Sequence, residues 1–306
     1  MAQSFPLSLG VPTSRHARLR ALLTGPQVVC APGAFDCLTA RLVEQAGFDA
    51  LYVTGSGVSI SRLGAPDVAV ISFSEVLDQV KRIVDVTTIP VVADADTGYG
   101  GPLNVIRTVR EFEKAGVSAI QIEDQDWPKR CGHELGRRVV DTQVMVDRIK
   151  AATDARHDSD FVVVARTDAR TVLGLDAALE RACAYVEAGA DVIFVESPES
   201  KAEMARITRE VPAPTLANLV EGGRTPILTR DELNSIGYRL AIYPNSLTRL
   251  IGRMGAVMLD ALQSTGTTAS MAEHMLSHRA LWDLFDYDDW IACESRYLSG
   301  NAPASK

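Results

Sequence analysis

Short apolar runs recur along the chain and alternate with segments of helical period. Eight runs rich in β-branched residues lie near residues 29, 52, 92, 120, 163, 193, 216 and 241, and read "QVVCAP", "ALYVTG", "PVVADAD", "SAIQIED", "FVVVART", "DVIFVES", "PTLANLV" and "RLAIYPN". Their nearly continuous apolar character is typical of strands that are buried on both faces. They follow one another at intervals of roughly 30 residues, the length of one strand plus one helix. The pattern therefore predicts eight βα units.

The segments between the runs predict amphipathic helices. "AFDCLTARLVEQAG", "LNVIRTVREFEKAG" and "LDAALERACAYVEAG" end in Gly47, Gly116 and Gly189, a position typical of a helix C-terminus. The apolar residues of the first two share one face: Leu38, Leu42 and Val43, and Val105, Val109 and Phe112. Eight such units favour a closed (β/α)8 barrel of the TIM type. A doubly wound open sheet is the alternative, weakened because no glycine-rich dinucleotide fingerprint follows the first strand.

The last fifth of the chain predicts helices outside the barrel. We expect one domain over residues 1–306, with the barrel at about 25–246 and a helical extension at 247–298. The segment "LTRLIGRMGAVMLDALQS" has apolar residues at helical spacing: Leu247, Leu250, Ile251, Met254, Met258 and Leu262. The following segment carries Trp282, Phe285 and Trp290. So many large apolar groups on terminal helices predict packing against a neighbouring subunit.

Composition narrows the class of protein. The net charge of −8, without a basic tail, disfavours general binding to nucleic acid. No apolar stretch reaches the ~18 residues of a membrane span, and the N-terminus lacks the pattern of a secretory signal. The five cysteines are scattered and odd in number, which favours a reduced, cytoplasmic protein over a disulfide framework.

Polar residues gather where the predicted strands end. The active sites of such barrels lie at the carboxyl ends of the strands. In strand order, from the second to the eighth, these ends carry Thr54, Gly55 and Ser56; Asp94 and Asp96; Glu123 and Asp124; Arg166 and Asp168; Glu196; Asn218; and Asn245 and Ser246. The sequence therefore predicts a site at this end of the barrel.

The stretch "DADTG" predicts a metal site. Alternate residues of a strand point the same way, so Asp94 and Asp96 should converge. With Glu123 from the next strand they offer the oxygen ligands that Mg²⁺ prefers. The alternative, an aspartate that caps a helix or orders a turn, is less favoured beside Glu123. Asp67, in "GAPDVAV", could by position be only a turn residue.

Arg166 ends the apolar run "FVVVAR" and needs an anionic partner. A structural pair with Glu196 or Asp94 and a substrate carboxylate are both open. Asn218 could contact a substrate oxygen or bond to the backbone.

The stretch "WPKRCGHELGRR" places a thiol in a cationic loop after the fourth strand. Cys131 and His133 are too closely spaced for half of a standard zinc finger, and no partner pair follows. Lys129 and Arg130 favour a thiolate and attract anions, so that Cys131 could act as a general acid or base. His133 could position a ligand carboxylate or the thiol. The alternative is an exposed basic loop with an incidental cysteine.

Five motifs together resemble the isocitrate lyase and phosphoenolpyruvate mutase superfamily. They are "DADTGYG", "IQIEDQ", "KRCGH", "ARTDA" and "NLVEGGRTP", and the resemblance runs from about residue 31 to 249. "KRCGH" resembles the lyase branches, since phosphonate-forming mutases lack this cysteine. The family implies a homotetramer, a dimer of dimers that exchange C-terminal helices.

The resemblance also implies roles for residues. Asp94 and Asp96 resemble carboxylates beside Mg²⁺, or Mn²⁺ in its place, with Glu123 joined through water and Asp67 farther out. Arg166 resembles a residue that contacts substrate oxygens, and Cys131 the acid that protonates the leaving enolate. Tyr52 and Glu123 are candidates for the base. The expected substrate-binding residues are Thr54, Gly55, Ser56, Lys129, Arg130, Gly132, His133, Glu196, Asn218 and Ser246.

The resemblance implies Mg²⁺-dependent retro-aldol cleavage of a 2-hydroxy di- or tricarboxylate to a 2-oxo acid and a second carboxylate. "NLVEGG" and "TGSG" resemble the family members that act on substituted malates such as 2,3-dimethylmalate, whereas "YPNSLTR" partly resembles those that cleave 2-methylisocitrate to pyruvate and succinate. Hydrolysis or decarboxylation of oxaloacetate is a further alternative.

Overall fold

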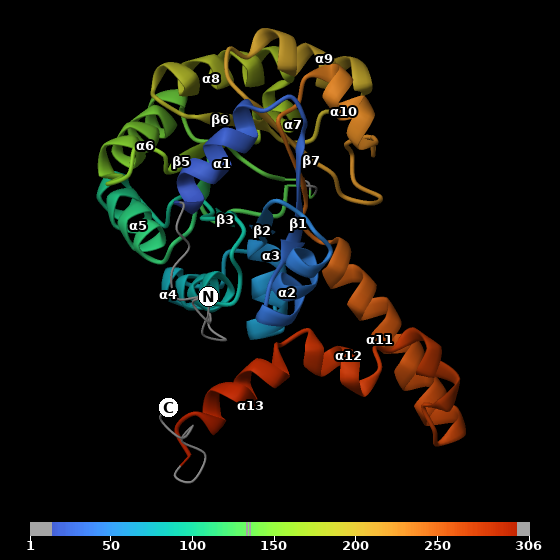
Figure 1. Ribbon diagram of the computed structural model, residues 1–306. Helices are drawn as coiled ribbons and strands as arrows, with labels where there is room; N and C mark the ends of the chain where they lie inside the picture. Colours follow the sequence, from blue (N-terminus) through green and yellow to red (C-terminus); the bar gives the residue numbers. More distant parts are fainter. Residues whose placement is uncertain (1–13, 133, 135, 299–306) are drawn as a thin grey trace.

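The computed structural model describes residues 14–298 except 133 and 135, and it contains a closed parallel barrel (Figure 1). Each strand pairs with the next, and the last pairs with the first. The strands are β1 (Val29–Ala34), β2 (Leu51–Val53), β3 (Val91–Asp94), β4 (Ala119–Glu123), β5 (Val162–Thr167), β6 (Val192–Val195), β7 (Thr215–Asn218) and β8 (Leu240–Tyr243). The prediction of a (β/α)8 barrel is confirmed, and the open-sheet alternative is wrong.

Burial on both faces explains the apolar strands. In β5, Val162 and Val164 belong to the cluster that fills the barrel, whereas Val163 and Ala165 pack in the layer beneath the helices. Successive side chains of a strand point to opposite faces, so each face of this strand needs its own apolar set.

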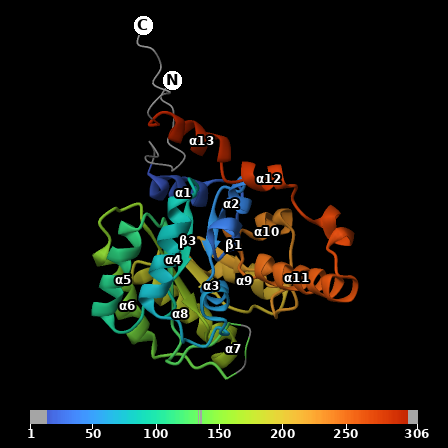
Figure 2. The same ribbon diagram turned by 90° about the horizontal axis from the view of Figure 1, so that it is seen from below.

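Helices surround the barrel and cover its outer face (Figures 1 and 2). They are α1 (Arg15–Thr24), α2 (Cys37–Gln45), α3 (Gly55–Leu63), α4 (Phe73–Asp85), α5 (Pro102–Lys114), α6 (Thr142–Ala155), α7 (Ala169–Leu173), α8 (Leu175–Glu187), α9 (Lys201–Glu210) and α10 (Arg230–Ile236). Gly47, Gly116 and Gly189 have φ values of +81°, +88° and +104°, which confirms the predicted C-terminal glycines of α2, α5 and α8.

Helix α1 closes the amino end of the barrel. Leu19 and Leu23 are buried in the cluster that fills the barrel interior. Arg20 Nη2 donates to Asp191 Oδ1 at 2.8 Å, which ties α1 to the segment before β6. Apolar side chains of α1 therefore fill the amino end, and the polar residues that follow the strands lie at the carboxyl end.

The C-terminal extension leaves the barrel, as Figures 1 and 2 show. It comprises α11 (Ser246–Thr265), the short 3-10 helix η1 (Ala269–His274), α12 (His278–Asp283) and α13 (Tyr287–Ser295). No residue of α11 is buried, and Trp282 and Trp290 are 42% and 46% exposed. The extension touches the barrel through Arg41 of α2, which donates to Leu284 O at 3.0 Å. Of the apolar groups that were predicted to pack against a subunit, five are exposed in the single chain: Leu250, Ile251, Leu262, Trp282 and Trp290.

Of the helices within the described residues, none combines the length and apolar character that crossing a membrane requires.

Candidate active site

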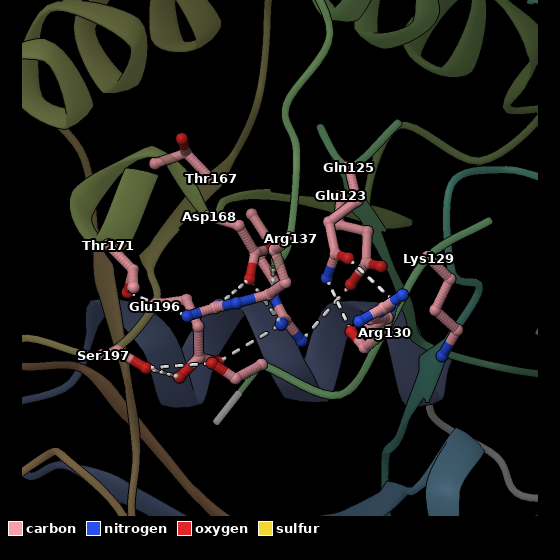
Figure 3. Close-up of polar contacts among 12 residues, drawn as sticks. Glu123, Gln125, Lys129, Arg130, Arg137, Thr167, Asp168, Thr171, Glu196 and Ser197 are labelled. Carbon is pink, nitrogen blue, oxygen red and sulfur yellow. Dashed lines mark hydrogen bonds and ion pairs between the residues drawn. The ribbon is translucent and has the colours of Figure 1, made fainter. Parts of the chain in front are cut away.

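The segment after β4 contacts residues that follow β5 and β6, as the pair of Arg137 with Asp168 shows (Figure 3). Gln125 fixes it by binding both backbone groups of one residue: its Nε2 donates to Arg130 O and its Oε1 accepts from Arg130 N, each at 2.9 Å. Ser197, after β6, donates its hydroxyl to Gly132 O at 3.1 Å. The loop that carries Cys131 is thus bound at two points.

Gly132 packs directly on charged side chains from β5 and β6. A Cβ atom at this position would lie 2.4 Å from Arg166 Nη2 and 2.8 Å from Glu196 Cδ. Only glycine allows this approach, which brings the neighbouring Cys131 into the lining of the barrel-end cavity.

Lys129 points inward, toward aspartates. Its buried Nζ forms ion pairs with Asp67 and with Asp96, the latter at 2.5 Å. Burial favours the neutral amine, but Asp96 and Asp67 raise the pKa of Lys129 well above its usual value, so the side chain stays charged. Arg130, in contrast, is exposed.

Asp94 and Asp96 come together through a turn. Strand β3 ends at Asp94, and Asp96 has a φ of +49°, which is rare for a residue other than glycine. Asp96 N donates to Asp94 Oδ1 at 3.1 Å and stabilises the turn. The expectation that both lie on one strand face was wrong, because the backbone turns after Asp94. Such strained residues persist where surrounding contacts fix them, often at active sites.

The carboxylates here fit a hydrated cation. Glu123 Oε1 is buried without a hydrogen bond, and Asp96 Oδ1, also buried, has the Lys129 ammonium as its partner. Burial, and next the charge of Asp96, raise the pKa of Asp94 to about 6. Among the described residues, no group of three His, Cys, Asp or Glu side chains is arranged to hold a metal ion by itself. This arrangement suits Mg²⁺, which takes few protein ligands and keeps several waters.

Arg166 is held by carboxylates on three sides. Its Nε and Nη2 donate to Asp168 at 3.0 and 2.9 Å, its Nη1 lies 3.3 Å from Glu123 Oε2, and its Nη2 lies 3.5 Å from Glu196 Oε2. Of the two structural partners considered from sequence, Glu196 is present, whereas the structure gives no ion pair between Arg166 and Asp94. The main partner of Arg166 is Asp168, which the sequence predicted only as one of the polar residues at the end of the fifth strand.

Arg137 extends this network and was missed by the sequence reasoning. Its buried guanidinium pairs with Asp168, and its Nη2 donates to Thr171 at 2.8 Å (Figure 3). Despite burial, Arg166 and Arg137 hold the pKa of Asp168 below its usual value. The end of the Cys131 loop is therefore anchored to the residue that orients Arg166. The only sign of this residue in the sequence is the pair of arginines in "GRR", and that pair does not reveal that Arg137 binds Asp168.

The start of α3 lies beside Asp94. Thr54 caps this helix by accepting from Gly57 N at 3.3 Å. A Cβ on Gly55 would lie 2.9 Å from Asp94 Oδ2, and Ser56 lines the cavity. The N–H groups of a first helical turn have no partner within the helix and favour anions.

Tyr52 and Glu123 differ as candidate bases. Tyr52 donates its hydroxyl to Gln121 Oε1 at 3.1 Å, and burial raises the pKa of Tyr52 well above its usual value. Burial also raises the pKa of Glu123. A carboxylate whose pKa is raised is a stronger base than an ordinary carboxylate, whereas the raised pKa of this phenol keeps it protonated.

A cavity of about 40 Å³ lies at the centre of these residues. It is lined by Tyr52, Thr54, Ser56, Asp67, Asp94, Cys131, Gly132, Arg166, Phe194, Glu196, Asn218, Val220, Ile242, Pro244 and Asn245. This volume holds only one or two water molecules, so a substrate requires the loop to move.

One predicted residue lies elsewhere, and another falls outside the described residues. Ser246 donates to Glu221 Oε1 at 2.5 Å and lines a different, apolar cavity, whereas its neighbour Asn245 lines the central one. His133 lies outside the described residues. Asn218 is placed in the site, where its Nδ2 donates to Glu196 Oε2 at 3.0 Å.

Comparisons with known proteins agree with this geometry. The phosphoenolpyruvate phosphomutase family model matches residues 19–262. The chain is 48% identical to 2,3-dimethylmalate lyase of Eubacterium barkeri over 284 residues, which cover 93% of this chain and 98% of that protein. It is 42% identical to 2-methylisocitrate lyase of Escherichia coli over 269 residues, which cover 88% and 91%.

Solved structures give the same result. Oxaloacetate acetylhydrolase in complex with 3,3-difluorooxalacetate superposes with a TM-score of 0.88 at 35% identity, covering 92% of this chain and 96% of that one. Phosphonopyruvate hydrolase in complex with oxalate and Mg²⁺ superposes with a TM-score of 0.85 at 32% identity, covering 94% and 100%.

Proposed function

The chain belongs to the phosphoenolpyruvate phosphomutase family, and we propose that it cleaves a substituted malate, such as 2,3-dimethylmalate, in a Mg²⁺-dependent retro-aldol reaction. The resemblance inferred from its motifs is confirmed, and so is the prediction of an enzyme of the lyase class. The substrate, the metal and the roles of individual residues are our proposal.

One observation carries the proposal. A thiol, Cys131, a guanidinium, Arg166, and a metal-fitting carboxylate, Asp94, line the same enclosed cavity. A retro-aldol cleavage needs a proton donor for the carbanion, a cation for the carboxylate and a divalent ion for the oxygen that becomes a carbonyl. These needs match the three groups.

The residues that would hold Mg²⁺ are Asp94 and Asp96, with Glu123 and Asp67 around them through water. When bound, the ion supplies positive charge that stabilises the developing 2-oxo acid. Mn²⁺, which also accepts oxygen ligands, would serve in its place.

The protein side chains would do the remaining work. The first turn of α3 and Arg166, which Asp168 keeps in orientation, bind the carboxylate next to the reacting carbon. Glu123 accepts the proton of the substrate hydroxyl, since Tyr52 is held as a neutral phenol. The C2–C3 bond breaks, its electron pair passes to C3, and the Cys131 thiol delivers a proton there. The products are a 2-oxo acid and a second carboxylate.

The lining of the cavity favours an alkyl-substituted substrate. Phe194, Val220 and Ile242 form an apolar part of the wall. A methyl group of the substrate fits such a wall, which supports the smaller, alkyl-substituted substrate. Identity to a 2,3-dimethylmalate lyase over nearly the whole chain supports the same choice.

We also propose a cytoplasmic homotetramer built from dimers that exchange their C-terminal helices. The apolar face of α11 supports this, because Leu250, Leu259 and Leu262 are exposed. An apolar cavity of about 520 Å³ opens where α11 leaves the barrel, and Cys30, Leu42, Phe48 and Leu247 are among the residues that line it. A helix from a second copy would cover both surfaces. None of the five cysteines, all of which lie within the described residues, forms a disulfide, which supports a reducing compartment.

A substrate panel tests the proposed function. The purified protein is incubated with 2,3-dimethylmalate, 2-methylisocitrate and oxaloacetate, with Mg²⁺ or with EDTA, and release of pyruvate or oxalate is followed. We expect fastest release of pyruvate from 2,3-dimethylmalate and none with EDTA. Oxalate release from oxaloacetate as the main activity would favour the hydrolase alternative, and no release from any substrate would refute a lyase.

A further inference from the structure

Gln125 uses its whole side-chain amide to bind the main chain of one residue in the Cys131 loop. Gln125 is only 1% exposed. Its Nε2 donates to Arg130 O and its Oε1 accepts from Arg130 N, each at 2.9 Å (Figure 3). A primary amide carries a donor and an acceptor side by side, as the main chain of a paired strand does. It therefore satisfies both main-chain groups of Arg130 at once, which neither a lysine nor an ionised carboxylate can do.

The backbone of Gln125 belongs to the base of the loop. Gln125 lies opposite Val139 in an antiparallel bridge. Two backbone hydrogen bonds of 2.9 Å join residues 124–126 to residues 138–140, where the chain leaves the barrel and returns to it. The side chain of Gln125 thus connects the closed base of the loop to the residue directly before Cys131.

The bonds to Arg130 fix the directions of its two neighbours. Lys129, before it, points inward and pairs with Asp96. Cys131, after it, lines the central cavity, whereas Arg130 itself is exposed. The carbonyl group of Arg130 is part of the planar peptide that joins it to Cys131. Because Gln125 holds this carbonyl, it sets the orientation of the peptide from which the thiol-bearing residue projects.

The contact on the other side of Cys131 is less exclusive. Ser197 Oγ lies 3.1 Å from Gly132 O, but it also lies 3.0 Å from Glu196 Oε1. A serine hydroxyl has one proton, so it donates to one of these two acceptors at a time. The amide of Gln125 has a separate group for each of its two bonds. Gln125 therefore provides the stronger restraint on the backbone around the thiol.

We propose that Gln125 is a positioning residue for Cys131, and that it places the thiol by binding both main-chain groups of Arg130. The part of this inference that concerns proton transfer to C3 rests on the proposed lyase function, whereas the placement of the thiol does not. Gln125 is not among the residues that line the central cavity. Its loss should therefore impair proton transfer while leaving the binding of the 2-oxo acid end intact.

Steady-state kinetics separate positioning from binding. Gln125→Met keeps the length of the side chain and removes both hydrogen bonds. Gln125→Glu keeps the acceptor for Arg130 N, but its ionised form cannot donate to Arg130 O. A misplacement of about 1 Å can slow a reaction about 10²-fold. We expect kcat for 2,3-dimethylmalate to fall by about this factor in Gln125→Met and by less in Gln125→Glu, while the inhibition constant of oxalate with Mg²⁺ stays unchanged.

Alkylation of Cys131 tests the placement of the thiol without a substrate. Iodoacetamide is added to each folded protein, and mass spectrometry follows the peptide that contains Cys131. The thiol lines a small enclosed cavity, so we expect slow alkylation in the wild type, faster alkylation in Gln125→Glu and the fastest in Gln125→Met. Gln79→Leu is the matched control. It removes a buried glutamine of α4 that accepts from Arg62 at 3.2 Å, and it should change neither kcat nor the alkylation rate.

Two results would overturn the inference. One is wild-type alkylation of Cys131 in both variants, and the other is an inhibition constant of oxalate that rises as much as kcat falls. If Gln125→Met does not fold, Gln125→Glu decides by the same two measurements. A wild type that releases no 2-oxo acid from any substrate refutes the proposed function instead, and the alkylation rates still test the placement of the thiol.

Discussion

Lys129 Nζ lies 2.5 Å from Asp96 Oδ1, so the loop that carries the candidate proton donor is joined by charge to the carboxylates that fit a metal ion. The same ammonium group pairs with Asp67. Closure of the loop and binding of a divalent cation at these carboxylates therefore influence one another, because both act on the same negative charges.

Replacing Lys129 by methionine should make the protein depend on Mg²⁺ for stability. Loss of the ammonium leaves the buried Asp96 and the half-buried Asp67 without their counter-charge, which costs about 3–5 kcal/mol in the metal-free protein. Thermal unfolding should show a larger rise in Tm on adding Mg²⁺ for Lys129→Met than for the wild type. Lys150→Met, at an exposed lysine of α6, serves as control. An equal Mg²⁺ effect in both proteins would contradict the coupling.

Replacing Asp96 by asparagine should weaken metal binding. The substitution keeps the size of the side chain and removes the negative charge of a buried carboxylate that lies beside the Lys129 ammonium. We expect the Mg²⁺ concentration for half-maximal activity to rise by at least about ten-fold, the scale seen when groups around a metal are altered. Asp147→Asn, on the exposed face of α6, should leave it unchanged. An Asp96→Asn protein with wild-type Mg²⁺ dependence would remove this residue from the metal site.

Replacing Cys131 by serine should slow cleavage without preventing binding. A serine hydroxyl is a far weaker acid than a thiol, so kcat for 2,3-dimethylmalate should fall by about 10²–10⁴. Binding of oxalate with Mg²⁺ should persist, because it does not need the proton. Cys183→Ser, in the outer helix α8, is the control and should retain full activity. Oxaloacetate decarboxylation that survives in Cys131→Ser would identify that reaction as independent of the thiol.

Replacing Arg137 by methionine should loosen the loop from the barrel. Arg137 is buried and holds Asp168, which in turn orients Arg166. Breaking this pair should cost about 3–5 kcal/mol in the free energy of unfolding and lower kcat as well. The neighbouring Arg138 is exposed and pairs with Asp126 at 3.0 Å, so Arg138→Met should do neither. Chemical denaturation and steady-state kinetics on the two variants decide the point.

The barrel could be predicted from the sequence because the patterns that produce its strands and helices lie within short segments of the chain. A strand buried on both faces needs an apolar run such as "FVVVA", and a helix that ends before a strand needs a glycine such as Gly116. The end of the barrel that carries the site followed from the same pattern, since each polar residue is fixed by the strand that precedes it.

Partners that depend on loops were not predictable. The pair of Arg137 and Asp168 forms only because a long loop folds back, and no spacing rule states which cation will reach which carboxylate. Likewise, Asn245 lines the central cavity, whereas its neighbour Ser246 lines the apolar one. Which of the two faces which cavity depends on how the backbone turns after β8. The inward direction of the Lys129 side chain also depends on how the loop folds, so it was not predictable from the sequence either.

The most direct test of the account is to identify the products of 2,3-dimethylmalate formed in D₂O with Mg²⁺, by nuclear magnetic resonance. Cleavage of C2–C3 followed by protonation at C3 predicts equal amounts of pyruvate and propionate, the propionate carrying one solvent-derived deuterium at C2. Unchanged 2,3-dimethylmalate, or propionate without deuterium, would contradict retro-aldol cleavage completed by an exchangeable acid in this site.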